Sequence, residues 1–297
     1  MTSERPLLRA LASVAVTVGL LVWVGSRVDR SAVWGALEGG RWGWWLAAAA
    51  LGPVQVGRAA ARWRVACARL GLLLGGGVAV REVALSTLLN QLLPGGVAGD
   101  VVRAWRVRQP GHALAGPVRA VLVDRFVGLA VHVAVVALGL LAWRAVHGVS
   151  APAGAVPTAV AVAAGLLAIL AAPAGWPGLG SLAADLRRAL GAPGPAVAQV
   201  SLSVALTASF LLAFEACARA LGHPLGVAAL TAVPLVLLAM AIPASIGGWG
   251  WREATAALVL PRLGWSPEQA VALSAVYGLS VLVGALPGAL VPLWRDR

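Results

Sequence analysis

Apolar runs long enough to cross a membrane alternate along this chain with short segments that carry arginine, and one such run spans Val118–Trp143. A transmembrane helix needs about 20 consecutive, mostly apolar residues. Of all residues 60% are hydrophobic and 11% are charged, whereas about a quarter of a soluble domain is charged. Because helices satisfy their own backbone hydrogen bonds inside lipid, we expect an all-α, polytopic transmembrane helix bundle.

Six to eight spans and two re-entrant or broken helices are expected, in a single domain covering residues 1–297. The expected spans are Leu7–Val24, Trp44–Ala60, Val118–Trp143, Pro157–Ala172, Ala196–Leu221, Val227–Ile242 and Glu268–Leu293. The stretch Val83–Leu93 is too short to span and predicts a re-entrant hairpin. A loop is expected around Asp185, Arg187 and Arg188. The first span reads as an uncleaved helix.

Charge sets the expected orientation and excludes several classes of function. The net charge is +12 and the chain contains no lysine. Arginine-rich segments belong on the cytoplasmic side, so both termini are expected in the cytoplasm of a cell carrying this protein in its inner membrane. Arginine at membrane edges attracts anionic lipid headgroups. The arginines alternate with apolar spans instead of forming a basic soluble face, which argues against a nucleic-acid partner.

Neither a metal site nor an enzyme is indicated. Cys67 and Cys217 lie far apart in the sequence and have no ligand spacing. The sequence contains no HExxH, GxSxG or Walker A motif. We therefore expect no metal, no cofactor and no catalytic residues.

Two stretches interrupt the apolar pattern in the same way, Pro94–Arg103 (PGGVAGDVVR) and Pro243–Arg252 (PASIGGWGWR). Each begins with proline, has glycine five residues on and arginine nine residues on. Backbone breakers and charges are unfavourable inside a membrane unless the non-helical backbone lines a polar cavity. The two stretches therefore predict broken helices around one polar site.

The residues of the first stretch suggest how such a site would bind an anion. Pro94 ends the incoming helix and Gly95 permits a tight turn. Asp100 is a candidate cap of the next helix, whose N-terminal N–H groups favour anions. Arg103 adds a planar, bidentate donor suited to phosphate. Arginines at two ordinary glycine-rich turns near the membrane surface are the alternative interpretation.

Charges inside the apolar runs are expected to find partners. Asp124 and Arg125 are adjacent, so on a helix their side chains point about 100° apart and each needs a partner elsewhere. Glu215 and Arg219 are four residues apart and can pair with each other.

The pairing of the two stretches predicts an inverted repeat with halves at about residues 44–143 and 196–293, and broken helices that meet near the midplane. The candidate substrate-binding residues are Asn90, Pro94, Gly95, Gly99, Asp100, Arg103, Asp124, Arg125, Pro243, Gly247, Gly248, Gly250, Arg252 and Glu253.

The chain resembles the membrane domain of bacterial lysylphosphatidylglycerol synthase/flippase proteins and related stand-alone flippase-like membrane proteins. Three motifs in the same order carry the resemblance: NQLLPGGVAGDxxR from Asn90, DRxxGL from Asp124 and PxSIGGxGxRE from Pro243. Two positions depart from that pattern. Ala98 stands where a second glycine is expected, and Asp124 stands where glutamate is more usual. The chain ends at Arg297, which leaves no room for the soluble aminoacyl-transferase domain of the full synthases, so lipid synthesis is not expected.

The resemblance implies a bundle with re-entrant helices that moves an anionic, aminoacylated or polyprenyl-linked lipid between leaflets. The headgroup phosphate would lie between Arg103, Arg252 and Arg125. The alternatives are a secondary transporter of small anionic solutes, a membrane enzyme acting on lipid-linked substrates, and a scaffold. The expected partners are membrane lipids, with a homo-oligomer or a separate lipid-modifying enzyme as further candidates.

Overall fold

The computed structural model describes residues 4–26, 31, 34, 38, 40–108, 114–173, 175–176, 178–242 and 244–293. These residues form helices and no β-strand, with one isolated β-bridge between Pro94 and Ile246. The helices are α1 (Glu4–Gly25), α3 (Trp42–Arg69), α4 (Gly76–Leu92), α5 (Ala98–Arg106), α6 (Ala115–His147), α7 (Ala155–Ala171), α8 (Leu179–Leu190), α9 (Pro193–Ala220), α10 (Ala228–Thr231), α11 (Val233–Ala239), α12 (Trp251–Val259) and α13 (Pro267–Ala285), with 3-10 helices η1 (Leu260–Leu263) and η2 (Leu286–Leu293).

Three of the described helices are long and apolar enough to cross a membrane: Ala115–His147, Pro193–Ala220 and Pro267–Val291. Val14–Gly25, Ala155–Ala171 and Ala228–Ala239 are shorter apolar helices. The prediction of an all-α bundle with several apolar spans is confirmed. The count of six to eight spans stays a prediction.

Several predicted boundaries are wrong. The second expected span, Trp44–Ala60, continues to Arg69, because Trp63, Ala66 and Cys67 carry the buried helical face beyond Ala60. The expected loop around Asp185 is helix α8, which buries Leu186 and Ala189 in a cluster with side chains of α6.

The helices that precede the two breaks also differ from expectation. Helix α4 begins at Gly76, seven residues before the expected stretch. The expected span Val227–Ile242 is divided into α10 and α11 at Ala232. Pro234 stands in the first turn of α11, where its missing N–H removes no intrahelical bond.

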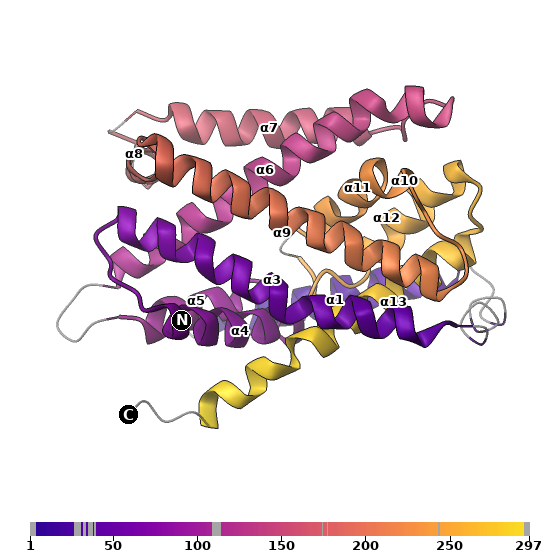
Figure 1. The fold of residues 1–297 in the computed structure, drawn as a ribbon, viewed down its shortest axis with the longest axis horizontal. Coiled ribbons are helices and arrows are strands. Elements are labelled where there is room, and N and C mark those ends of the chain that lie inside the picture. Colours follow the sequence, from indigo (N-terminus) through magenta and orange to yellow (C-terminus); the bar gives the residue numbers. More distant parts are fainter. Residues whose placement is uncertain are drawn as a thin grey trace.

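The main apolar core comes mostly from α6, α9, α11 and α13, and α3 packs along α9 and α13 (Figure 1). Gly52 and Gly284 let α3 and α13 approach closely, since a Cβ at Gly52 would lie 2.6 Å from the Gly284 Cα. Small residues at helix contacts let the backbones of membrane helices approach closely. Such helices associate by van der Waals packing, because the hydrophobic effect does not drive association inside lipid. The buried side chains of Trp143, Phe214 and Leu273 fill the neighbouring space.

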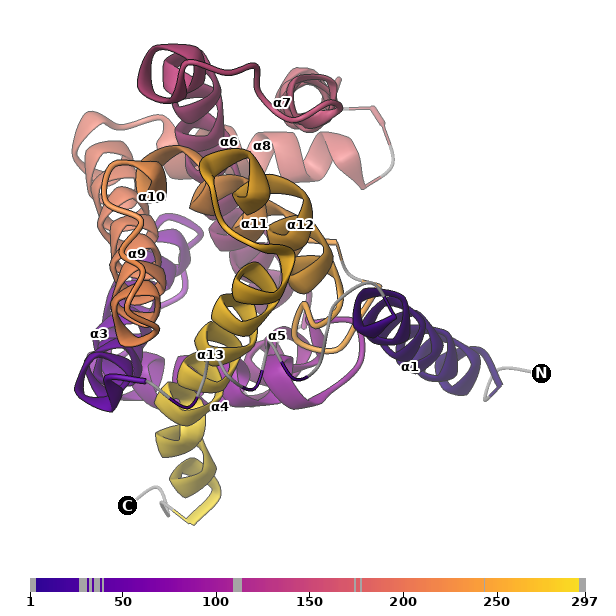
Figure 2. The ribbon, with the colours of Figure 1, turned by 90° about the vertical axis from the view of Figure 1, so that its right-hand side faces the viewer.

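The two helix breaks lie side by side on one part of the bundle. Helices α4 and α5 pack against each other and are joined by residues 93–97, and α11 and α12 are joined by residues 240–250. Helix α1 contacts α12 and extends away from the rest of the bundle (Figure 2). Helix α5, which follows the first break, packs against α6, and helix α1 packs against α12, which follows the second break.

Candidate functional site

The two breaks meet through their backbones. Pro94 and Ile246 form an antiparallel bridge, and the Gly95 N–H donates to the Ser245 carbonyl at 3.1 Å. A Cβ at Gly247 would lie 2.9 Å from the carbonyl oxygen of Gln91, so the second break packs directly on the end of α4. Residues about 150 positions apart thus form one junction, as the paired sequence motifs predict.

Each break turns on two consecutive glycines in the left-handed region. Gly95 and Gly96 have φ values of 84° and 60°, and Gly247 and Gly248 have 54° and 79°. Residues with a Cβ rarely adopt such angles. The glycines of the motifs are therefore explained by backbone geometry. Pro243, the first residue of the second motif, lies outside the described residues.

Asn90, and not Asp100, accepts the hydrogen bond of an otherwise unpaired backbone N–H in the first turn of α5. The Gly99 N–H donates to Asn90 Oδ1 at 2.8 Å, and the N-cap residue Val97 makes no side-chain cap bond. A Cβ at Gly99 would overlap the backbone of Ser86, so α4 and α5 are in direct contact there. The predicted capping role of Asp100 is wrong, because its carboxylate is directed to arginines instead.

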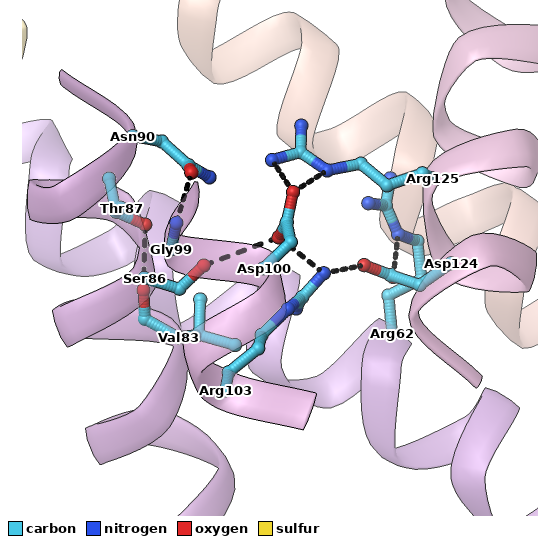
Figure 3. Close-up of polar contacts among 10 residues, drawn as sticks. All are labelled: Arg62, Val83, Ser86, Thr87, Asn90, Gly99, Asp100, Arg103, Asp124 and Arg125. Carbon is cyan, nitrogen blue, oxygen red and sulfur yellow. Dashed lines mark hydrogen bonds and ion pairs between the residues drawn. The ribbon is translucent and has the colours of Figure 1, made fainter. Parts of the chain in front are cut away.

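Five charged side chains form a row of alternating sign, here called the charge ladder: Arg125, Asp100, Arg103, Asp124 and Arg62 (Figure 3). Arg125 Nε donates to Asp100 Oδ2 at 2.7 Å, and Asp100 Oδ1 lies 3.0 Å from Arg103 Nη2. The same Nη2 lies 3.1 Å from Asp124 Oδ2, and Asp124 Oδ1 accepts from Arg62 Nε at 2.7 Å. Three arginines and two aspartates leave the ladder with a net charge of +1.

Exposure changes along the ladder. The side chains of Asp124, Arg103, Asp100 and Arg62 are 2%, 4%, 8% and 9% exposed, whereas that of Arg125 is 52% exposed. Buried charges are tolerated when each has a charged or hydrogen-bonding partner. Of the five residues, Arg125 is therefore the one that can reach a ligand without unfolding the ladder.

Neighbouring helices complete the buried end of the ladder. Arg62 Nη1 also donates to Ser203 Oγ of α9 at 3.2 Å. Its guanidinium lies over Gly128 of α6, where a Cβ would come within 2.6 Å of Nη1. The guanidinium of Arg103 lies 4.7 Å from the Trp63 ring centroid, which adds a cation–π contact. The predicted separate partners of Asp124 and Arg125 are confirmed, and so is the Glu215–Arg219 pair at 2.8 Å.

Arg252 belongs to a second cluster. Its Nη2 lies 2.7 Å from Glu253 Oε1, its Nε donates to Ser274 Oγ at 3.0 Å, and the side chain is fully buried. A Cβ at Gly278 would overlap its guanidinium, as at Gly128 beside Arg62. The structure thus brings Arg103 and Arg125 together through Asp100 and gives Arg252 different partners.

The sequence spacing of the motifs does not match their structural register. Arg103 is the sixth residue of α5, whereas Arg252 is the second residue of α12. This difference exceeds the uncertainty of one or two residues in helix ends. The acidic residues correspond instead, since Asp100 and Glu253 are each third in their helix. Glu253 Oε2 accepts from the Gly250 N–H at 2.6 Å and caps α12.

Arg62, Ser203 and Ser274 were not among the predicted site residues. Arg62 follows an apolar span and reads as a cytoplasmic charge under the positive-inside rule. The continued helical spacing of Ala60, Trp63 and Cys67 is the signal that places it on a buried helix. Ser203 and Ser274 carry no such signal, because serine is common in membrane helices.

One of three comparisons with known proteins gives a match. The family model described as lysylphosphatidylglycerol synthase TM region matches residues 10–288. No curated protein and no solved structure matches the chain. With the apolar helices described above, the match shows an integral, multi-pass membrane protein.

Proposed function

Because the chain belongs to the lysylphosphatidylglycerol synthase transmembrane-region family, we propose that it translocates a lipid with an anionic, aminoacylated or polyprenyl-linked headgroup between leaflets. One observation carries the proposal. Two helix breaks meet at Pro94 and Ile246, and the α4–α5 hairpin of one break carries Asp100, which binds the half-exposed Arg125. Such a protein gives a headgroup a polarised route while the acyl chains stay in the bilayer.

Arg125 is the proposed first contact for the headgroup phosphate. Its Nε and Nη2 both bind Asp100 Oδ2. A phosphate can compete for this planar pair of donors, because guanidinium binds carboxylate and phosphate in the same bidentate geometry. When Arg125 turns to the phosphate, Asp100 keeps bonds from Ser86 and Arg103. The ladder's net charge of +1 then balances one phosphate charge.

The lengths of the broken helices support the proposed re-entrant course. The hydrocarbon core is about 30 Å thick, and helix α4 with its 17 residues extends about 26 Å at 1.5 Å per residue, so the support comes from the shorter helices that follow the breaks. Helices α5 and α12 have nine residues each. The antiparallel bridge between the breaks and their matched glycine pairs support an inverted repeat, with the junction at its centre. In this proposal Arg103 and Arg252 stabilise the fold through their buried ion pairs and do not contact the phosphate. From the sequence, the phosphate was expected between all three arginines.

Reconstituted protein tests translocation and the role of Arg125 together. In vesicles with fluorescent phosphatidylglycerol and its aminoacylated form, we expect native protein to expose inner-leaflet lipid to a membrane-impermeant quencher. Arg125→Gln should slow this exchange about tenfold or more, since a hydrogen bond to a charged group contributes about 1.5–3 kcal/mol.

Arg219→Gln is the matched control, because Arg219 is 46% exposed and ion-paired like Arg125 but lies near the other end of the bundle's long helices, in α9. It should exchange lipid at the native rate. Native protein that moves neither of these two lipids, nor a fluorescent polyprenyl phosphate tested in the same way, contradicts the proposed function. Equal rates for Arg125→Gln and native protein contradict the role of Arg125 alone.

A further inference from the structure

Arg58 places a charge in the middle of two packed helices. It lies in α3, which runs antiparallel to α9: the Arg41 N–H before α3 donates to the carbonyl of Ala220, the last residue of α9, at 2.6 Å. Arg58 Nη1 donates to the carbonyl of Ala205 at 3.2 Å. Counted from Pro193, Ala205 is the thirteenth of the 28 residues of α9, a helix long and apolar enough to cross a membrane. The guanidinium therefore lies beside the central part of a membrane helix.

Arg58 has no carboxylate partner among the residues that the structure describes. Arg62, one turn further along α3, pairs with Asp124 at 2.7 Å. The bond from Arg58 to α9 uses one of the five N–H donors of a guanidinium. An arginine at membrane depth is expected to pair with an opposite charge or to reach a polar region. In this part of the chain, Arg58 leaves its charge without a protein counter-ion.

Bonding between the two helices does not by itself call for an arginine at this position. Gln55, three residues earlier on the same face of α3, makes the same kind of contact, because its Nε2 donates to the Ser209 carbonyl of α9 at 3.3 Å. Polar side chains often join membrane helices in this way. A neutral side chain is thus sufficient for the contact, whereas a charge at this depth adds an unfavourable free energy unless it is compensated. The charge of Arg58 is the feature that requires a further partner.

The guanidinium can be approached from outside the bundle. Arg58 is partly exposed, and Val54, one turn earlier on the same face of α3, is 43% exposed. On α9, Ser201 is exposed and lies one turn before Ala205. Helices α3 and α9 form one edge of the bundle, and α1 lies at the opposite edge (Figure 2). A lipid molecule beside this pair of helices therefore has access to Arg58.

We propose that Arg58 binds the phosphate of an anionic phospholipid that lies along α3 and α9 as a bound, non-transported lipid. A guanidinium offers planar pairs of donors that fit phosphate oxygens. The net negative charge of the lipid compensates the arginine, whereas a zwitterionic phospholipid already carries its own ammonium group. A long arginine side chain extends towards the interface and the bilayer thins around it, so phosphate and guanidinium can meet. Arg58 is on a different helix from Arg125, and this binding does not depend on lipid translocation.

A lipid titration of the purified full-length protein tests the site. The Arg125→Gln protein is used, because it lacks the proposed headgroup contact of the translocation route. Thermal unfolding in detergent is followed at rising mole fractions of dioleoyl phosphatidylglycerol or of dioleoyl phosphatidylcholine. We expect a saturable rise in Tm, larger with phosphatidylglycerol by roughly 2–4 °C. Adding Arg58→Gln should raise the half-saturating mole fraction of phosphatidylglycerol about tenfold. Equal rises with the two lipids, or the same titration curve after Arg58→Gln, overturn the proposal.

Two further variants in the same Arg125→Gln protein distinguish this site from a general attraction to basic side chains. Arg64→Gln is the matched control, since Arg64 is also in α3 and donates to a backbone carbonyl, that of Leu74 at 3.1 Å, but is exposed. It should titrate like Arg125→Gln alone. Arg58→Lys keeps the charge and should bind phosphatidylglycerol more tightly than Arg58→Gln does. Equal weakening by Arg64→Gln and Arg58→Gln, or by Arg58→Lys and Arg58→Gln, overturns the assignment. Native protein that moves no lipid would leave these expectations unchanged.

Discussion

Asp124→Asn is expected to destabilise the protein by about 3–5 kcal/mol, the cost of removing one partner from a buried ion pair. Asp124 is 2% exposed and holds two buried guanidiniums, Arg62 at 2.7 Å and Arg103 at 3.1 Å. Without its charge the ladder would carry a net charge of +2. Thermal unfolding in detergent, with solubilised yield as a second readout, measures the loss.

Two comparisons distinguish the loss of buried pairing from loss of any ion pair. Arg219→Ala removes the exposed partner of the Arg219–Glu215 pair, whose glutamate also accepts from two backbone N–H groups, and should cost less than about 1 kcal/mol. Adding Arg62→Met to Asp124→Asn removes one of the two orphaned guanidiniums, so the double variant should be more stable than Asp124→Asn alone. If the stability loss of the double variant equalled the sum of the losses of Arg62→Met and Asp124→Asn, Arg62 and Asp124 would not be energetically coupled, and the prediction would be contradicted.

Gly99→Ala is the second change with a large expected effect. Its Cβ would overlap the backbone of Ser86, and backbone cannot move aside as a flexible side chain can. We expect a loss of about 1–3 kcal/mol or more. Separation of α4 from α5 should also displace Asp100, whose Oδ1 accepts from Ser86 at 3.2 Å, and so reduce lipid exchange.

Gly77→Ala is the matched control for Gly99→Ala. Gly77 also lies in a helix, α4, but a Cβ there would meet nothing within 4 Å. Alanine has a higher helix propensity than glycine by up to about 1 kcal/mol. Gly77→Ala should therefore be neutral or stabilising in the same unfolding and lipid-exchange assays. Equal losses in the two variants would show that the close contact at Ser86 does not exist.

The sequence predicted the features that depend on local chemistry. A proline followed by consecutive glycines, or consecutive glycines close after a proline, favours a helix break, so the breaks at Pro94 and at Gly247 could be located without coordinates. Charge inside an apolar run requires a partner, so Asp124 and Arg125 were expected to pair with other segments. Their partners, Arg62 and Asp100, could not be assigned.

The features that sequence did not predict depend on contacts between distant segments. Arg62 donates a second hydrogen bond to Ser203, 141 residues away, and no local pattern specifies that contact. The equal spacing of Arg103 and Arg252 suggested equivalent roles, but the helix after the second break begins only at Trp251. Arg252 therefore lies one turn earlier in its helix than Arg103 and faces other partners.

Disulfide formation between the two breaks tests the central claim, that they form one junction in the membrane. Pro94→Cys and Ile246→Cys are combined in a chain whose buried Cys67 and Cys217 are replaced by Ala. Facing residues of an antiparallel pair have Cβ atoms about 4.5–5.5 Å apart, close to disulfide range. A protease site placed at the exposed residues 222–224, in the connection between α9 and α10, separates the two cysteines of each pair, so that after cleavage a cross-linked chain can be distinguished from a cut one.

After mild oxidation in native membranes and proteolysis, we predict that the two fragments stay joined until a reductant is added. Ser280→Cys with native Cys217 is the positive control, because Cys217 Sγ lies 3.7 Å from Ser280 Oγ. Fragments that separate in the Pro94–Ile246 pair, while those of the control stay joined, would contradict the account.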